Sequence, residues 1–504
     1  MKKSIIISII GLGLTATSCD SYLDINQDPN SPAAENVTSS MLFPTTEMNL
    51  ATSYGNTLRI QGGYLAQHYS QEFGTSNYLA YSRFNMSGTS SSRVYNDLNV
   101  RVIKNATLIV EKAKAAEDCG ALLAATVMRA FAYQALVDCY GEVPYTESMD
   151  ATNVSPKYDE GKDIYAGILA ELDEALSHVK GTEAMPTNFL FPGKKADTWV
   201  KFANSLKLRL LMRESGTVDV QAQLDKLVAD DNFITSDVAY QGCWKNESGQ
   251  MNPFYAEEFS TAWGSTQINV ILNIALQATM QQVNADGDIV YEDPRLAAWF
   301  NKNSSGNFTG GVSGTNFSTA AETYPLAYWC RPVASFDMPV YLMTMSEVKF
   351  FLAEYYAKKG NSAAAEAAYK EAVNASFATA GVDGAAENLA KYPYNQNNYK
   401  QVIGLAKWIA LSGVNNFEAF CELRRLKYPT FGTVTGEDLF NETKADYHPE
   451  LYVPGTLYTP ITVNNQVGAN KLLQRFAYPE NSTSRNSKSP EFKGYTTPIF
   501  WAEN

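Results

Sequence analysis

The sequence predicts a mainly α-helical protein built on tetratricopeptide-like helix pairs, with a loop-rich irregular part in which we expect the ligand-binding surface. Three observations lead to this prediction. Apolar residues recur at helical spacing over about 92–230 and again over about 339–427. One helix pair in the second range fits a repeat template. Between the two ranges helical periodicity is lost while aromatic residues remain frequent.

The first residues have the layout of a bacterial lipoprotein signal. Lys2 and Lys3 precede a short apolar run, which is too short to span a bilayer as a helix. Small residues then lead to Cys19, as at the acylation site of a lipoprotein, although Ala16 stands where the strict pattern prefers Leu. We therefore expect residues 1–18 to be a lipoprotein signal peptide and Cys19 to carry the lipid. The alternative is a cysteine that merely lies near a cleavage site.

A polar segment follows the proposed lipid site. Residues 19–40 are rich in Asp, Asn, Ser and Pro, and we expect them to form an extended tether before a single domain over 41–504. Asp20, Asp24 and Asp28 stand at four-residue spacing within it. They are either an address for export to the cell surface or part of a solvated linker, and the sequence leaves both open.

Composition excludes several classes of protein. The formal net charge is −13, and the one basic cluster, Arg424, Arg425 and Lys427, is too small for a nucleic-acid surface. No stretch beyond the signal region approaches about eighteen continuous apolar residues, so we expect the lipid to be the membrane attachment. The cysteines after Cys19 are scattered and odd in number, which argues against a disulfide framework and against a zinc site. A single disulfide bond stays as an alternative.

Amphipathic spacing divides the first helical range into separate helices. We predict them over 92–117, 122–140, 164–179, 198–213 and 221–228. The segment 231–338 is rich in Gly, Asn, Ser, Thr and aromatic residues and is too long for a plain loop in a compact domain. It predicts short strands, short helices and ordered loops, and residues 428–504 are predicted to be irregular as well.

The second helical range contains the repeat signal. Small residues that let two helices approach alternate there with aromatic residues that fill the groove between them. Six template positions are matched, at Leu352, Ala353, Tyr356, Ala365, Tyr369 and Ala372. Gly360 and Asn361 supply the turn. Residues 121–180 predict a looser pair with a longer insert, and the chain from Lys400 predicts a further pair.

The common catalytic motifs are missing from the sequence. It has three histidines, none near another, and no HExxH, GxSxG or phosphate-binding glycine loop. Glu257 and Glu258 are adjacent and do not converge on one bond, but carboxylates paired by folding leave a glycosidase as an alternative. Residues 284–288, NADGD, predict a turn, with a calcium loop as the alternative. We expect no cofactor and no metal.

Aromatic residues are the main candidates for binding. The chain has 30 Tyr, 24 Phe and 7 Trp, many of them in non-helical segments. Aromatic faces stack on the C–H faces of sugars while amide and guanidinium groups bind the hydroxyls, although most aromatic residues in any domain only pack. We favour as platforms Tyr78, Tyr81, Trp263 and Trp329, with Arg83 and Asn77 as polar partners.

Segments along nearly the whole chain resemble the SusD/RagB family, the surface nutrient-binding lipoproteins of Bacteroidetes. In order they are CDSYLDINQDPN, RAFAYQALVDCYGEVPYTES, WVKFANSLKLRLLMRES, DPRL, PVYLMTMSEVKFFLAEYYAKKG, KWIALSGVNNFEAFCELRRLKYP and RFAYPENSTSRN. The resemblance implies an all-α core of tetratricopeptide-like helix pairs and a loop-rich remainder that builds the ligand site. Binding residues vary between members of the family, so none is carried over to this sequence.

The resemblance also implies a function. It implies a lipid-anchored protein of the outer membrane, facing the cell surface, which binds nutrient oligosaccharide and delivers it to a SusC-like TonB-dependent transporter as its hinged lid. From the missing catalytic motifs and the acidic composition we expect no enzymatic activity and no nucleic-acid partner. RagB-like capture of peptides is the first alternative. A surface glycan hydrolase and a protein-binding scaffold are the others.

Overall fold

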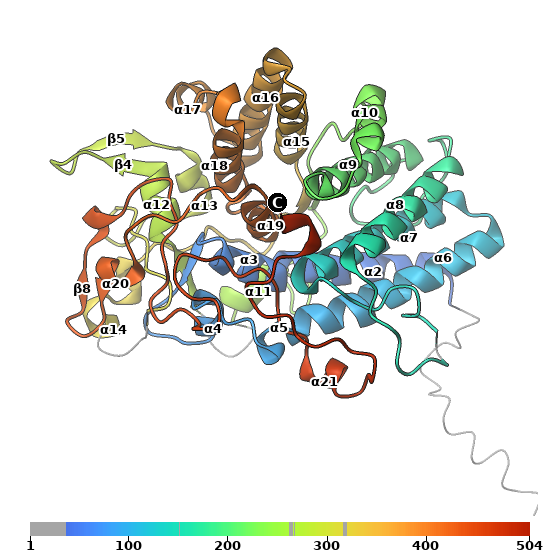
Figure 1. The fold of residues 1–504 in the computed structure, drawn as a ribbon, viewed down its shortest axis with the longest axis horizontal. Coiled ribbons are helices and arrows are strands. Elements are labelled where there is room, and N and C mark those ends of the chain that lie inside the picture. Colours follow the sequence, from blue (N-terminus) through green and yellow to red (C-terminus); the bar gives the residue numbers. More distant parts are fainter. Residues whose placement is uncertain (1–36, 151, 262–265, 267, 316–319, 504) are drawn as a thin grey trace, which may run out of the picture.

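The computed structural model of the protein describes residues 37–150, 152–261, 266, 268–315 and 320–503. Helices form most of the regular structure, and the strands pair only in twos, so the predicted mainly α fold is confirmed. Figure 1 shows the long helices at the top and right, and short elements joined by loops at the left and along the bottom. The expected signal peptide and most of the expected tether lie outside the described residues.

The helices before residue 231 form the first helical region. They are α2 (Ser39–Thr52), η2 (Ser53–Leu58), α3 (Arg59–Leu65), α4 (Leu79–Ser82), α5 (Gly88–Asn96), η3 (Asp97–Ile103), α6 (Lys104–Ala116), α7 (Cys119–Tyr140), α8 (Gly161–Ser177), α9 (Ala196–Glu214) and α10 (Gln221–Asp230). The helix predicted over 92–117 is one continuous run of α5, η3 and α6, in which η3 is a wider π-helical turn. A second continuous helical segment, from α2 through η2 to α3, lies before the first helix that the sequence predicted, which begins at residue 92.

Short elements occupy the segment in which helical periodicity was lost. They are β2 (Val238–Tyr240), α11 (Pro253–Glu258), β3 (Val270–Leu272), α12 (Ile274–Met280), β4 (Gln281–Val283), β5 (Ile289–Glu292), α13 (Arg295–Trp299), α14 (Ala320–Thr323) and η4 (Leu326–Tyr328). The antiparallel pairs β1 (Tyr69–Gln71) with β3 and β2 with β6 (Val340–Met343) tie this segment to the helical part. β4 and β5 form a hairpin.

Helices return after β6, and the last part of the chain is again irregular. Its elements are α15 (Met345–Lys358), α16 (Ser362–Ala380), α17 (Ala385–Lys391), η5 (Gln396–Asn398), α18 (Tyr399–Leu411), α19 (Asn416–Leu426), α20 (Gly436–Leu439), β7 (Phe440–Asn441), β8 (Asp446–Tyr447), η6 (Pro449–Leu451), α21 (Glu480–Thr483) and η7 (Phe500–Ala502).

The repeat template corresponds to the antiparallel pair α15–α16. Gly360 has φ +72°, which favours glycine, and Asn361 caps α16 by accepting from the Ala364 N–H. Ala353 and Ala372 are fully buried, as close helix approach requires. The looser pair and the later pair are α7–α8 and α18–α19, whose members also pack on each other.

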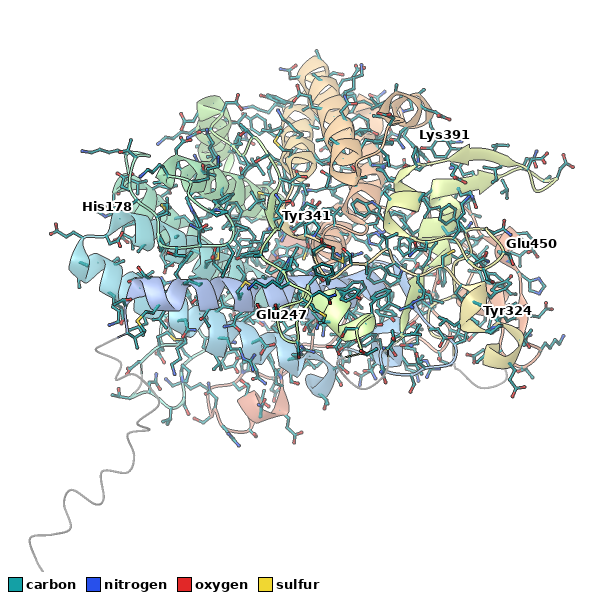
Figure 2. All side chains as sticks on the ribbon, turned by 180° about the vertical axis from the view of Figure 1, so that it is seen from behind. His178, Glu247, Tyr324, Tyr341, Lys391 and Glu450 are labelled. Carbon is teal, nitrogen blue, oxygen red and sulfur yellow. The ribbon has the colours of Figure 1, made fainter. Side chains whose placement is uncertain are left out.

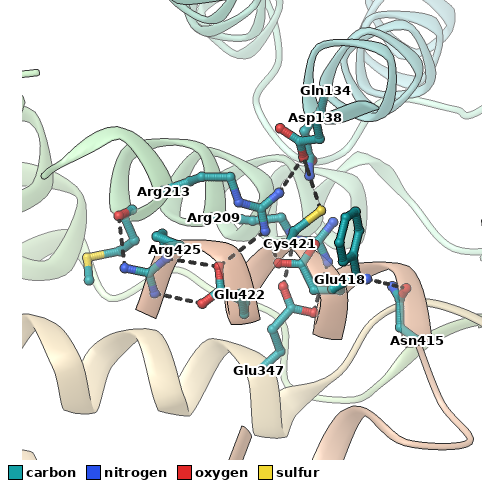
Figure 3. A network of polar contacts seen from close by, with 12 residues as sticks. Gln134, Asp138, Arg209, Arg213, Glu347, Asn415, Glu418, Cys421, Glu422 and Arg425 are labelled. Carbon is teal, nitrogen blue, oxygen red and sulfur yellow. Dashed lines mark hydrogen bonds and ion pairs between the residues drawn. The ribbon is translucent and has the colours of Figure 1, made fainter. Parts of the chain in front are cut away.

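A buried network of charges joins α7, α9, α15 and α19 (Figure 3). Lys407 of α18 extends it through an ion pair with Glu422 of α19. Arg213 of α9 pairs with Asp138 of α7 at 2.5 Å and with Glu422 of α19 at 3.3 Å. Arg209, one turn earlier, pairs with Glu347 of α15 at 2.6 Å. Removing one partner of such a pair costs about 3–5 kcal/mol, because it leaves the other charge buried and uncompensated. Separation of these helices would therefore leave buried charges without their partners.

Two pKa shifts show that burial and charge pairing act against each other in this network. Burial would raise the pKa of Glu354, but Arg425 and Lys358 outweigh it and lower the pKa to about 2. Burial lowers the pKa of Lys407 to about 8, although its ammonium lies 2.8 Å from Glu422. These charges stay ionised near neutral pH only because each has its partner.

Among the described residues, only α7 is long and apolar enough to cross a membrane. Within its most apolar stretch, 94% of the residues are buried inside the protein, as expected of a core helix.

Candidate ligand-binding site

Tyr78 and Tyr81 form a stacked aromatic surface, which we call the tyrosine pair. α4 begins directly after Tyr78, so the i, i+3 spacing places both rings on one side of the turn. Their centroids lie 5.5 Å apart with an interplanar angle of 11°. Tyr64 of α3 packs edge-on against Tyr78 with centroids 5.8 Å apart. Both rings of the pair are half-buried, so they are held firmly and still reach the surface.

Polar groups flank the tyrosine pair in the positions that the sequence suggested. Asn77 is exposed, and Arg83 is half-buried directly after α4. Arg83 Nε donates to the Gly314 carbonyl at 3.0 Å. Burial lowers the pKa of Arg83, while Glu442 opposes this shift. The Nη groups of Arg83 make no hydrogen bond to the described residues, so they are the groups that would donate to a ligand in the function proposed below.

Glu258 anchors the tyrosine pair to the irregular segment. Its carboxylate is buried and accepts from the Asn269 backbone N–H at 3.0 Å and from the Asn269 amide at 3.1 Å. Burial raises the pKa of Glu258, and hydrogen bonds from Tyr78 and Asn269 act against this shift. Burial together with this carboxylate raises the pKa of Tyr78, so its hydroxyl stays a donor.

Two segments far apart in sequence therefore meet at this surface. The Tyr78 N–H donates to Gln71 Oε1 at 2.8 Å, next to the strand pair β1–β3. The Gly314 N–H donates to Ser82 Oγ at 2.7 Å. The sequence named 77–83 and 254–329 as the two contributing segments, and these contacts bring them together.

Trp329 is placed differently from its proposed role. It belongs to an aromatic cluster, the Trp329 cluster, whose members are Phe73, Tyr324, Tyr328, Trp329, Phe440 and Tyr447. Trp329 is only 2% exposed. Its indole N–H donates to the Tyr324 carbonyl at 3.2 Å, and its ring lies 4.5 Å from that of Phe73. The prediction that Trp329 is a sugar platform is therefore wrong. Its ring is packed on both sides and leaves no face for a sugar, so Trp329 is a buried support.

The exposed members of the Trp329 cluster are the tyrosines before it. Tyr328 is 36% exposed and Tyr324 is half-buried, with centroids 5.0 Å apart. Figure 2 shows Tyr324 at one edge of the molecule, on the side of Glu450 and far from His178. Sequence reasoning noted these tyrosines only as aromatic residues in a non-helical segment.

Two sequence candidates lie outside the described residues. They are Trp263, proposed as a platform, and Cys19, proposed as the lipid site. Both remain predictions.

The tyrosine pair is partly exposed and does not line any of the larger clefts of the described residues. Five clefts of about 180–790 Å³ lie elsewhere, and neither Tyr78 nor Tyr81 lines any of them. The largest lies between α8, α9 and α10. An open aromatic surface suits an extended ligand that lies across it better than a small molecule that must be enclosed.

The histidines do not form a catalytic group. His68 is fully buried beside Trp408 and Asn416, and burial lowers its pKa to about 3. His448 is paired with Asp446 and Glu450, which raise its pKa. His178 lies on the opposite side of the molecule (Figure 2).

The described residues also bear on the two alternatives left by the sequence, a metal site and a disulfide bond. The described residues contain no group of three or more His, Cys, Asp or Glu side chains that could hold a metal ion. The five described cysteines are free thiols. Residues 284–288 form the β4–β5 turn, in which Asn284 Oδ1 accepts from the N–H groups of Asp286 and Asp288.

Glu258 and Tyr64 are contributors that sequence reasoning missed. Tyr64 lies in a long helical run, and Glu258 was noted only as one of two adjacent carboxylates. Tyr64 packs against the tyrosine pair through a contact made by folding, and Glu258 affects the pKa of Tyr78, a residue 180 positions before it in the chain. Nothing in their local sequence marks them.

Together these features define a helical-repeat binding protein whose candidate surface is built by loops and short helices. The chain belongs to the SusD/RagB family. The profile of the SusD-like family described as "Starch-binding associating with outer membrane" matches residues 29–446. This family consists of nutrient-binding proteins associated with the outer membrane.

Solved structures share the fold along nearly the whole chain. A SusD homologue from Bacteroides uniformis is 20% identical, with a TM-score of 0.71, over 92% of this chain and 99% of that chain. A SusD-like protein from Bacteroides thetaiotaomicron is 18% identical, with a TM-score of 0.69, over 91% and 99%. A structure titled "chitin-binding protein" is 19% identical, with a TM-score of 0.67, over 93% and 100%. No curated protein matches the sequence.

Proposed function

We propose that the protein binds nutrient oligosaccharide at the cell surface and delivers it unchanged to a SusC-like TonB-dependent transporter, for which it serves as a lid. A lipid on Cys19 would hold it to the outer membrane. Membership of the SusD/RagB family supports the general role. The observation that carries the specific proposal is the tyrosine pair, a stacked and half-exposed aromatic surface with Arg83 and Asn77 beside it.

The geometry of the tyrosine pair suits a sugar chain. The rings lie nearly parallel and are fixed by Tyr64 and Glu258, so little conformational entropy is lost when a ligand binds. Each sugar–water hydrogen bond exchanged for a sugar–protein bond brings a net gain of only about 0.5–1.5 kcal/mol. We therefore expect modest affinity, with aromatic stacking as a main contribution.

Peptide capture is the second candidate. Tyrosine and arginine are also the residues that anchor peptides at protein interfaces, and the open surface could accommodate an extended chain. The absence of a catalytic motif in the sequence favours binding over hydrolysis. A glycan hydrolase and a protein-binding scaffold are less favoured than either of these two functions.

Titration calorimetry against glycans and peptides tests the proposal. The panel contains maltoheptaose, chitohexaose, host and plant glycans and a peptide digest, because the family is described as starch-binding and one similar structure is titled as chitin-binding. Tyr81→Ala should weaken binding of the preferred glycan severalfold to a hundredfold. Tyr81→Phe keeps the ring and should retain most of the affinity.

Phe492→Ala is the matched control. Phe492 is an aromatic residue that is 37% exposed outside the candidate site, so its loss should leave glycan affinity unchanged. Binding to peptides alone would move the protein to the peptide-capturing group. Shortening of a bound glycan during incubation would contradict the non-enzymatic proposal.

A further inference from the structure

A polar segment between α17 and α18 contributes to a second concave feature. Residues 392–398 read YPYNQNN, in which two tyrosines flank a proline and four amide side chains follow. The segment carries no charged residue, although helices lie on both sides of it in the chain. Figure 1 shows α17 and α18 in the upper part of the molecule and α4, which begins within the tyrosine pair, at the bottom. The segment is therefore separate from the site described above.

The segment lines a cleft of about 380 Å³, which we call the amide cleft. Its apolar lining comes from α16 and α18 and consists of Val373, Val402, Leu405, Ala406 and Ile409. Its uncharged polar lining consists of Asn388, Tyr392, Tyr394, Asn395, Asn398 and Gln401. None of the described residues that line it is acidic. A volume of this size is within the range of small-molecule sites in proteins.

The two cations of the amide cleft leave no buried charge unmatched. Arg295 donates to the two oxygens of Asp293 at 3.0 and 2.6 Å and to Ser376 Oγ at 2.8 Å. Lys391 is exposed, and its ammonium lies 5.5 Å from the centre of the Tyr291 ring. What the lining offers to a ligand is therefore hydrogen bonding and apolar contact, which suit a neutral molecule.

Asn388 supplies a fixed acceptor to the amide cleft. It is 3% exposed, and its Nδ2 donates to Tyr291 Oη at 2.7 Å and to Asp293 Oδ2 at 3.0 Å. Because the oxygens of Asp293 already accept from Arg295, the amide nitrogen must face them and the amide oxygen must point away. That oxygen accepts no hydrogen bond from the described residues and is not fully enclosed. A ligand in the cleft can therefore donate to it.

The two tyrosines of the amide cleft are held in place by their neighbours. Tyr392 packs edge-on against Tyr291 with centroids 6.1 Å apart. Tyr394 packs against Tyr369 with centroids 5.9 Å apart, and its hydroxyl donates to Gln396 Oε1 at 2.6 Å. Tyr392 and Tyr394 are nevertheless only half-buried. Such rings reach the surface and lose little conformational entropy when a ligand packs on them.

We propose that the amide cleft binds a neutral disaccharide, with the C–H face of one sugar ring on Tyr394 and its hydroxyls on the amide side chains. A sugar fits this lining because its hydroxyls both donate and accept, as amide groups do. Gln401 Nε2 makes no hydrogen bond to the described residues and would donate to one hydroxyl, while Asn388 Oδ1 would accept from another. The proposal does not depend on the tyrosine pair, because neither of its residues lines the cleft.

Calorimetry with maltose and with N,N′-diacetylchitobiose tests the proposal. The full chain carrying Tyr81→Ala is the starting protein, so that sugar binding at the tyrosine pair does not mask the cleft. At least one of the two disaccharides should bind to it. Adding Tyr394→Ala should weaken that binding about tenfold, because the ring on which the sugar packs is removed. Adding Phe492→Ala is the control, since Phe492 is an aromatic residue that is 37% exposed outside the cleft.

A second pair of variants tests the amide groups. Gln401→Ala removes an exposed amide that lines the cleft and should weaken disaccharide binding severalfold. Asn397→Ala removes an exposed amide of the same polar segment that does not line the cleft, so it should leave the affinity unchanged. If Tyr394→Ala prevents folding, the difference between these two variants must still be found.

Several outcomes would overturn the proposal. These are no binding of either disaccharide to the Tyr81→Ala protein, unchanged binding after Gln401→Ala, or an equal loss of binding in the control variants. Trialanine forms a further arm, and tighter binding of this peptide than of both disaccharides would show a peptide site in place of a sugar site. Glycan capture at the tyrosine pair is judged separately, from the effect of Tyr81→Ala on longer glycans, so failure of one site leaves the other intact.

Discussion

At the scale of single residues, Tyr81 and Trp329 show how two similar aromatic candidates receive different roles from folding. Both were chosen because they are aromatic residues in non-helical segments. Tyr81 keeps one part of its ring at the surface, whereas Trp329 is surrounded by Phe73, Tyr324 and Tyr447. The sequence identified both as aromatic residues of irregular segments, but the burial of Trp329 depends on Phe73 and Tyr447, which lie more than a hundred positions away in the chain.

This difference predicts different effects of the same substitution. Trp329→Ala removes a buried ring and should lower the free energy of unfolding by about 3–5 kcal/mol. Tyr81→Ala removes a half-exposed ring and should cost far less stability while it weakens glycan binding. Chemical denaturation and calorimetry on both variants measure the two effects. An unchanged unfolding midpoint for Trp329→Ala would contradict the supporting role of Trp329.

At the scale of elements, local sequence patterns were sufficient to predict the long helices but not to predict the candidate ligand-binding site. The ends of α7 and α16 follow from glycines that stop them, and the template positions of α15 and α16 follow from small and aromatic residues at fixed spacing. The candidate site depends instead on long-range contacts, such as Arg83 with Gly314 and Tyr78 with Glu258. Such contacts leave no periodic signal in the sequence.

The pair α15–α16 gives a direct test of the repeat packing. Ala353 is fully buried at the helix contact, so Ala353→Trp should overpack it and cost about 1–3 kcal/mol or more. Ala367 is exposed on α16, and Ala367→Trp is the matched control with little expected effect. Thermal unfolding of the two variants compares them. Equal midpoints would mean that the two helices do not meet at Ala353.

The contact between α2 and the loop before α9 should make stability depend on pH. Glu47 is fully buried, and burial raises its pKa to about 8, although its Oε2 accepts from the Phe189 N–H at 2.8 Å. Between pH 4.5 and 8 the folded carboxyl keeps a proton that the unfolded chain releases. Its contribution to the free energy of unfolding therefore falls as pH rises, by at most about 1.4 kcal/mol per pH unit.

Glu47→Gln should remove this dependence. Glutamine keeps an oxygen for the Phe189 N–H and does not titrate, so its unfolding free energy should change less between pH 5 and 8 than that of the wild type. Urea unfolding at several pH values measures the slope. Glu366→Gln, on the exposed face of α16, is the control and should keep the wild-type slope. A wild-type slope in Glu47→Gln would show that this carboxyl is not the group responsible.

At the scale of the whole molecule, stability and binding are assigned to different parts. The buried charges of α7, α9, α15, α18 and α19 pair with one another inside the helical part of the molecule. The tyrosine pair lies on short elements that are fixed to this core through β1 and α3. The candidate ligand surface is built on loops and short elements, which vary more between related proteins than the helices that support them. The solved structures share the fold, with TM-scores of 0.67–0.71, at identities of only 18–20%.

The remaining prediction concerns attachment, since the proposed role as a transporter lid requires the protein to stay at the membrane. Cys19→Ala removes the sulfur that we expect to be acylated, so the protein should appear in the soluble fraction and should not label with palmitate. Acyl chains contribute about 0.8 kcal/mol per buried methylene, and the described chain offers no exposed membrane span in their place. Cys119→Ala is the control, because Cys119 is a partly exposed thiol of the folded part whose loss should leave labelling and membrane attachment unchanged. If Cys19→Ala remains in the outer-membrane fraction and still labels with palmitate, the lipid lies elsewhere on the chain.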